Sequence, residues 1–283
     1  HNGQRLGRGT DLWKYWDELR MGNISGEEWE DIGKALSCGY GSCNTMGTAS
    51  TMNGILEALG IMPLGLSTLP VNSERRSAIN REAGKRIVAM VQEDLKPQDI
   101  LTPAAFRNAA AVCMALGGST NAILHLTAIA GRLNINLYPG VFNDIGAKVP
   151  CIVNVQPTGE KLIDEFDQAG GVPAVIARLG SFVDTAVITY TGKKLDTLLA
   201  DVKVRDNNII RTIATPVSHP PTLAIITGNL APRGAVVKVS AASPRLLKHT
   251  GRAFVFDSYE DMLNSIDDET LPIDASTVLI LRH

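Results

Sequence analysis

The sequence predicts an α/β protein in two parts, an α-rich N-terminal domain with a few strands and a β-rich, barrel-like C-terminal domain. Up to about residue 180, most apolar residues recur at helical spacing. Beyond residue 184, short β-branched runs alternate with Gly and Pro turns. We therefore place the domains at residues 1–182 and 183–283. A chain of 283 residues that is 45% hydrophobic is long enough to bury two cores.

The helices are predicted from spacing and from end signals. Residues 73–95 carry an apolar residue at every fourth position, and Pro97 follows them. Thr102 and Pro103 begin a helix to residue 116, because threonine caps well and proline suits the first helical position. Other helices are expected as a surface pair within residues 11–36, at 52–59, from 119 to about 130, up to 166, up to about 179, and at 259–266.

Strands are expected mainly in the second half. One lies at residues 151–155, and the others at 186–190, 209–213, 223–227, 235–239, 253–257 and 278–281. The last run stops two residues before the end of the sequence, and the first residue is histidine rather than methionine. We therefore expect the sequence to be a piece of a longer protein, with both domains partial.

Composition excludes several classes of function. The net charge is −2 and no basic block is present, so a nucleic-acid partner is not indicated. Apolar runs fall well short of the ~20 residues that a membrane span needs, and residues 1–9 do not resemble a signal peptide. A cytoplasmic protein is the simplest interpretation. The four cysteines are too scattered for a disulfide framework, so buried free thiols or metal ligands are expected.

Residues 38–51 are the segment most suited to chemistry. They are rich in glycine and small polar residues and lead into an apolar helix, with Cys43 near the transition. Glycine lets backbone N–H groups approach a ligand, and a helix N-terminus favours anions and thiolates. On this basis the segment binds phosphate, ligates a metal, holds a nucleophilic cysteine, or is a structural loop. No Cys-x-x-Cys pair indicates a zinc site, and no Gly-Lys-Ser/Thr indicates a P-loop.

Residues 41–52, followed by 57–60, resemble the dihydroxy-acid dehydratase and phosphogluconate dehydratase family. More narrowly, the Asn-Thr-Met-Gly-Thr-Ala-Ser run at 44–50 is similar to its sugar-acid branch, which includes arabinonate, xylonate and galactonate dehydratases. The resemblance continues in order along nearly the whole chain. It includes residues 81–88, 115–122, 156–159, 169–173, 228–232, 234–238 and 249–253.

The resemblance implies a hydro-lyase that converts a 2,3-dihydroxy sugar acid to a 2-keto-3-deoxy acid. An iron–sulfur cluster, [2Fe–2S] or [4Fe–4S], is implied as the Lewis acid for the departing hydroxyl, with Mg²⁺ on the carboxylate. A homodimer or homotetramer is implied as well. Two alternatives stay open, a dihydroxy-acid dehydratase of branched-chain amino-acid synthesis and a non-catalytic fragment without a complete site.

Carried over residue by residue, the resemblance makes Cys43 the third cysteine ligand of the cluster. The family's Cys-Asp-Lys motif is not found in the sequence, and Cys38, Cys113 and Cys151 do not lie in matching motifs. The segment with the serine thought to act as base is not found either, so the catalytic base is expected outside this chain.

Six further residues are candidates for substrate binding. They are Thr48, Ser119, Thr120, Asn121, Lys238 and Ser240. The simpler interpretation of residues 119–121 is that they cap a helix, because they follow two glycines at its start. Lys238 and Ser240 follow a predicted strand, and closure of the C-terminal domain over the substrate would bring them to its hydroxyl groups.

Overall fold

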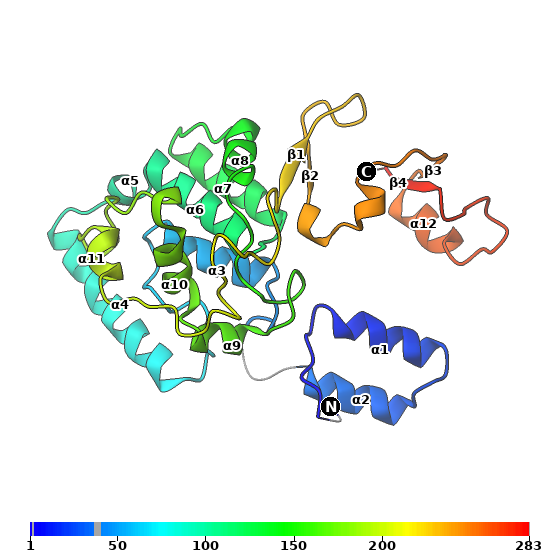
Figure 1. The fold of residues 1–283 in the computed structure, drawn as a ribbon, viewed down its shortest axis with the longest axis horizontal. Helices are drawn as coiled ribbons and strands as arrows, with labels where there is room; N and C mark the ends of the chain where they lie inside the picture. Colours follow the sequence, from blue (N-terminus) through cyan, green and yellow to red (C-terminus); the bar gives the residue numbers. More distant parts are fainter. Residues whose placement is uncertain (2, 37–40, 283) are drawn as a thin grey trace. The chain divides into compact units, whose positions relative to one another are not determined.

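The computed structural model describes residue 1, residues 3–36 and residues 41–282. The chain divides into two compact units, His1–Ala241 and Ala242–His283. Figure 1 shows that the first unit is built mainly of helices. The predicted residue Cys38 lies outside the described residues.

Helix α6 (Pro103–Ala115) is the centre of the first unit. Its start is the predicted one, with Pro103 at the first position and the Thr102 side chain accepting a hydrogen bond from the Ala105 amide. Every residue from 108 to 115 is buried, and four of these are alanines. Such small side chains let neighbouring helices approach closely. Helices α3 (Thr48–Ala58), α7 (Asn121–Arg132), α8 (Pro139–Gly146) and α10 (Gly171–Leu179) all contact α6.

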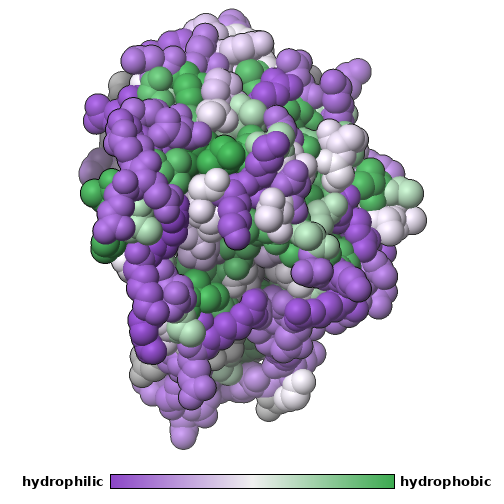
Figure 2. Space-filling view, turned by 90° about the vertical axis from the view of Figure 1, so that its left-hand side faces the viewer, coloured by the Kyte–Doolittle hydropathy of each residue, from purple (hydrophilic) through white to green (hydrophobic). Residues whose placement is uncertain are grey.

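Peripheral helices surround this centre. Helix α4 (Glu74–Gln92) lies within the predicted range and is capped by Ser73, but it has no buried residue, and Ile87, Val88 and Val91 are exposed on it. Figure 2 shows hydrophobic patches between hydrophilic ones on this side of the molecule. The remaining α-helices of the first unit are α1 (Asp11–Arg20), α2 (Gly26–Ala35), α5 (Pro97–Ile100), α9 (Ile163–Gln168) and α11 (Leu195–Leu199). No helix among the described residues combines the length and apolarity needed to cross a bilayer.

The predicted helical pair near the N-terminus is α1 and α2. The rings of Trp16 and Trp29 lie 5.5 Å apart and join the two helices. Leu6, Ile32 and Leu36 form a small core of their own beside them. The pair is therefore held together mostly by side chains that stay near the surface.

The described strands are short. Strand β1 (Ala224–Ile226) pairs antiparallel with β2 (Ala235–Val237), with Ile225 opposite Val236. In the second unit β3 (Ala253–Phe256) pairs in parallel with β4 (Val278–Leu281), connected through α12 (Tyr259–Ser265). Within the described residues these pairs form two separate two-stranded sheets and no closed barrel. A β-rich, barrel-like C-terminal domain therefore stays a prediction.

Residues 183–241 pack with the helices that precede them. The predicted strands at 186–190 and 209–213 make only single bridges, because Val187, Ile209 and Ile210 are buried in the core around α6. The first compact unit extends to Ala241, and a domain division after residue 182 stays a prediction. The strand predicted at 151–155 is likewise reduced to isolated bridges.

Glu57 is a fully buried carboxylate on α3 that fixes the loop after this helix. Its two oxygens accept hydrogen bonds from the backbone N–H groups of Gly65, at 2.7 Å, and Ser67, at 2.8 Å. Burial raises the pKa of Glu57 to about 7, and the two backbone donors oppose this rise. The folded state therefore holds this proton at pH values at which an unfolded glutamate has lost it.

The first prediction concerns stability against pH. Because the folded pKa is raised, the contribution of Glu57 to stability is fully present below pH 4.5 and is lost as pH rises towards 7. We expect the free energy of unfolding of the wild type, relative to Glu57→Gln, to be about 2 kcal/mol larger at pH 5 than at pH 8. Urea unfolding at both pH values measures it. Glu82→Gln on the exposed face of α4 is the control. A difference in unfolding free energy between the wild type and Glu57→Gln that is the same at pH 5 and pH 8 would contradict the prediction.

Candidate active site

Three of the predicted substrate-binding residues come together in one hydrogen-bonded group. The side-chain oxygens of Thr48 and Ser119 lie 2.9 Å apart. Asn121 Nδ2 donates to Thr48 Oγ1 at 3.1 Å, and the Asn121 amide donates to Ser119 Oγ at 3.2 Å. Thr48 is the first residue of α3 and Asn121 the first residue of α7. The group thus joins the N-terminal ends of two helices.

This position is electrostatically suited to an anionic, oxygen-rich ligand. The first turn of each helix has backbone N–H groups without intrahelical partners, and its dipole end is positive. The N-cap residues of the two helices are Gly47 and Thr120, and neither makes a side-chain capping bond. The Ser119 hydroxyl instead accepts a hydrogen bond from the Asn121 amide. Ser119 therefore caps α7 with its side chain, whereas Thr120 does not. Thr48 and Ser119 are partly exposed and Asn121 is exposed, which leaves the group accessible.

A tight turn at residues 117–118 sets the direction of Ser119. Gly117 has a φ of +62°, and a Cβ there would lie 2.8 Å from Thr158 Oγ1 and 3.0 Å from Cys151 Sγ. A Cβ on Gly118 would lie 2.8 Å from Cys113 Sγ. Only glycine fits at these two places. The turn ends with the Ser119 amide donating to Thr51 Oγ1 at 3.0 Å, which ties it to α3.

Lys238 and Ser240 reach the same turn from the segment after β2. Lys238 Nζ donates to the Gly117 carbonyl at 2.6 Å, and Ser240 Oγ lies 3.4 Å from Thr158 Oγ1. Burial lowers the pKa of Lys238, while the nearby thiols of Cys151 and Cys113 oppose this. These hydrogen bonds join Lys238 and Ser240 to Gly117 and Thr158, next to the group of Thr48, Ser119 and Asn121 but not to its members.

Cys43 lies in the exposed loop before α3. It lines a small cavity of about 90 Å³ together with Asn53, Arg76 and Asp164, among others. The neighbouring Asn44 is buried, and its side chain donates to the Leu6 carbonyl at 2.8 Å, which anchors the base of the loop. Cys43 is therefore presented to the surface from a fixed position.

The fit of this cavity to a metal group is partial. It offers the Cys43 thiol and one buried oxygen of Asp164 that has no partner among the described residues. Within the part of the chain that the structure describes, no group of three His, Cys, Asp or Glu side chains could hold a metal ion. The described residues thus offer Cys43 as one candidate ligand for the iron–sulfur cluster that the family resemblance implies, and not a complete ligand set.

The other two described cysteines are unsuited to metal binding in this state. Cys113 and Cys151 are free and buried. Burial raises the pKa of Cys113 to about 12 and that of Cys151 to about 11, so both remain thiols at neutral pH. They pack against the turn at residues 117–118 instead. This agrees with one of the two alternatives that the sequence leaves for the cysteines, buried free thiols.

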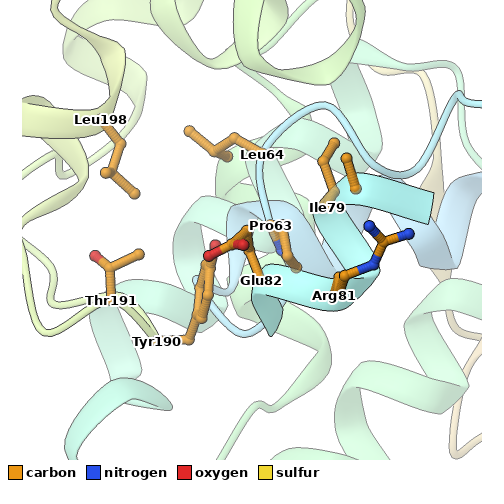
Figure 3. A pocket seen from close by; sticks show the side chains of 9 residues that line it. Pro63, Leu64, Ile79, Arg81, Glu82, Tyr190, Thr191 and Leu198 are labelled. Atoms are coloured by element: carbon orange, nitrogen blue, oxygen red, sulfur yellow. The ribbon is translucent and has the colours of Figure 1, made fainter. Parts of the chain in front are cut away.

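A larger cavity lies elsewhere in the first unit. It has a volume of about 470 Å³ and is bounded by α4, the turn at Pro63 and Leu64, and the loop around Tyr190 (Figure 3). None of the predicted site residues lines it, and its lining is mainly apolar apart from a few polar side chains. We therefore place the candidate site at the ends of α3 and α7.

Sequence reasoning missed two residues that hold the site together, Thr51 and Thr158. Both contact the turn at residues 117–118, as described above. Their segments carry the family resemblance, which is the one signal that pointed to them. Nothing in the local pattern indicates that they meet the same two glycines.

Comparison with known proteins gives a consistent result. Residues 3–198 match the model described as "Dihydroxy-acid/6-phosphogluconate dehydratase N-terminal", and residues 208–283 match the corresponding C-terminal model. The chain is 41% identical to a 6-deoxy-6-sulfo-D-gluconate dehydratase of Pseudomonas putida and 40% identical to an L-arabinonate dehydratase of Rhizobium leguminosarum bv. trifolii. Each alignment covers 99% of this chain and 49% of the relative.

Dihydroxy-acid dehydratases are similar too. The chain is 44% identical to one of Caldicellulosiruptor saccharolyticus, over 87% of this chain and 45% of the relative. The chain thus spans about half the length of the curated relatives it matches.

The second prediction tests the turn. Gly117→Ala introduces a Cβ at positive φ against Thr158 and Cys151, so we expect the free energy of unfolding to fall by about 2–4 kcal/mol. Gly131→Ala is the matched control, because a Cβ at this helical position meets nothing within 4 Å. It should be neutral or stabilise by about 0.5–1 kcal/mol. Equal effects of the two substitutions in urea unfolding would show that the turn has no such constraint.

Proposed function

Because the chain belongs to the dihydroxy-acid/6-phosphogluconate dehydratase family, we propose that it is part of a hydro-lyase that removes water from a sugar acid. The reaction would convert a 2,3-dihydroxy acid to a 2-keto-3-deoxy acid. Two relatives that match 99% of the chain are named as dehydratases of sugar acids, and this supports the sugar-acid branch. The alternative is dihydroxy-acid dehydration in branched-chain amino-acid synthesis, supported by the similar identity to dihydroxy-acid dehydratases.

The group of Thr48, Ser119 and Asn121 is the observation that carries the proposal. A sugar acid has a carboxylate and several hydroxyl groups, and both need hydrogen-bonding partners when they leave water. The ends of α3 and α7 offer positive dipole ends for the negative charge. The hydroxyls of Thr48 and Ser119 and the amide of Asn121 offer both donors and acceptors for the hydroxyl groups.

Cys43 is proposed as one thiolate ligand of an iron–sulfur cluster. When bound, such a cluster supplies an open iron that acts as a Lewis acid on a hydroxyl group. Mg²⁺ is proposed to neutralise the substrate carboxylate, with ligands from outside the described residues. The catalytic base is proposed to lie outside this chain as well. This chain would then bind and orient the substrate, and contribute Cys43. A cytoplasmic homodimer or homotetramer is the proposed form of the whole protein.

The third prediction tests the cluster. Because the described residues offer one candidate thiolate and not a complete ligand set, we expect the chain to retain less than one cluster per chain after anaerobic reconstitution, and Cys43→Ser to retain less iron and acid-labile sulfide than the wild type. Cys38→Ser is the matched control from the same glycine-rich segment and should retain as much as the wild type. Equal iron and sulfide in Cys43→Ser and in the wild type would refute Cys43 as a ligand.

The fourth prediction tests the substrate group. Asn121→Ala removes the side-chain donor to Thr48, so we expect the dissociation constant for D-gluconate or L-arabinonate to rise about tenfold. Calorimetric titration of the reconstituted chain measures it. Asn80→Ala, at an exposed position of α4, should leave the affinity unchanged. The same affinity in Asn121→Ala would place the substrate elsewhere.

A further inference from the structure

Lys238 is partly buried at the end of the central helix. Its ammonium group donates to the carbonyl of Gly117, two residues beyond the last residue of α6. The final carbonyls of a helix have no intrahelical partner and form the negative end of its dipole, so a cation is favourable there. Ala115, the last residue of α6, has its carbonyl satisfied differently, by the amides of Ile152 and Val153. Lys238 is thus the hydrogen-bond partner of the Gly117 carbonyl in the turn itself.

The turn is enclosed on its other sides. Thr158 and Cys151 pack against Gly117, and Cys113 and Thr51 pack against Gly118. The Gly118 amide also donates to the Cys113 carbonyl at 3.0 Å. The Gly117 amide likewise donates to the Met114 carbonyl at 3.1 Å, so the backbone ties the turn to α6, and Lys238 adds a second tie from the Gly117 carbonyl to the segment after β2.

The described groups that act on the charge of Lys238 are the thiols of Cys113 and Cys151. Neither of them is a carboxylate. A partly buried ammonium without a carboxylate partner keeps its charge through the dipoles of hydrogen-bonded carbonyls. The hydrogen bond to the Gly117 carbonyl therefore offsets part of the cost of burying the lysine.

We propose that Lys238 is a positioning residue, which holds the turn at residues 117–118 and thereby places Ser119 and Asn121 against Thr48. This role differs from direct contact with the substrate, the role that the sequence suggested. It couples the segment after β2 to the site, a coupling that Ser240 supports through Thr158. The importance of this positioning role for catalysis rests on the proposed function, whereas the contact of Lys238 with the turn does not.

Alkylation of the two buried thiols measures the opening of the turn directly. Cys113 faces Gly118 and Cys151 faces Gly117, so iodoacetamide reaches them when the turn opens. With the native chain at pH 8, we expect Lys238→Met to raise the labelling rates of both cysteines by about 10- to 100-fold. Peptide mass spectrometry separates them from Cys43 and Cys38. Lys148→Met, at an exposed position, is the control and should leave both rates unchanged.

The sign of the effect separates positioning from charge alone. The Lys238 cation lowers the pKa of both thiols, so its loss without opening would slow their alkylation. Lys238→Arg keeps the charge and the donor and should label at nearly the wild-type rate. Slower or unchanged labelling in Lys238→Met would overturn the proposal. Faster hydrogen exchange throughout α3 and α10, as well as in the turn, would also overturn the proposal, because that pattern indicates global destabilisation.

Failure of the proposed dehydratase function would leave these labelling rates untouched, since the experiment needs neither cluster nor substrate. Failure of the positioning role would show in the labelling rates even if sugar acids bind. The two results are therefore distinguishable.

Discussion

Close packing around α6 is the constraint on which the first unit depends. Its alanines allow α3 and α7 to approach from different sides, and both helices contact it and each other. Because α6 ends in the turn at residues 117–118, the chain leaves the helix directly towards the start of α7. The start of α3 is then near enough for Thr48 and Ser119 to share a hydrogen bond. The same packing that stabilises the core therefore assembles the candidate site.

Local signals in the sequence predicted what is local in the fold. Ser73 and Thr102 cap the helices that follow them, and such caps can be recognised from a few residues. Pairing of strands depends on partners far away in the sequence. The runs at 186–190 and 209–213 have the composition of strands, yet their apolar side chains are buried against helices. The backbone of each run forms only one isolated bridge. The sequence pattern did not distinguish these two outcomes.

For the candidate site, the sequence selected segments but not the contacts between them. Thr48, Ser119 and Asn121 were selected because their segments resemble one family, and the structure brings them together. Lys238 was expected to reach a substrate, but its ammonium group is bonded to the Gly117 carbonyl. A long flexible side chain has many possible end points, and only the packed neighbours select one. Thr51 and Thr158 were missed for the same reason, since their roles exist only in the folded chain.

The site consists of two parts that differ in their exposure to solvent. The turn at residues 117–118 is packed among buried groups on both flanks, so the hydroxyl group of Ser119 has a fixed direction. Cys43 instead lies on an exposed loop that is anchored at Asn44. The Asn44 side chain accepts from the Arg8 amide and donates to the Leu6 carbonyl, so this loop is anchored as well. The packed turn would therefore orient a substrate, while the anchored loop keeps the Cys43 thiol accessible to a metal group.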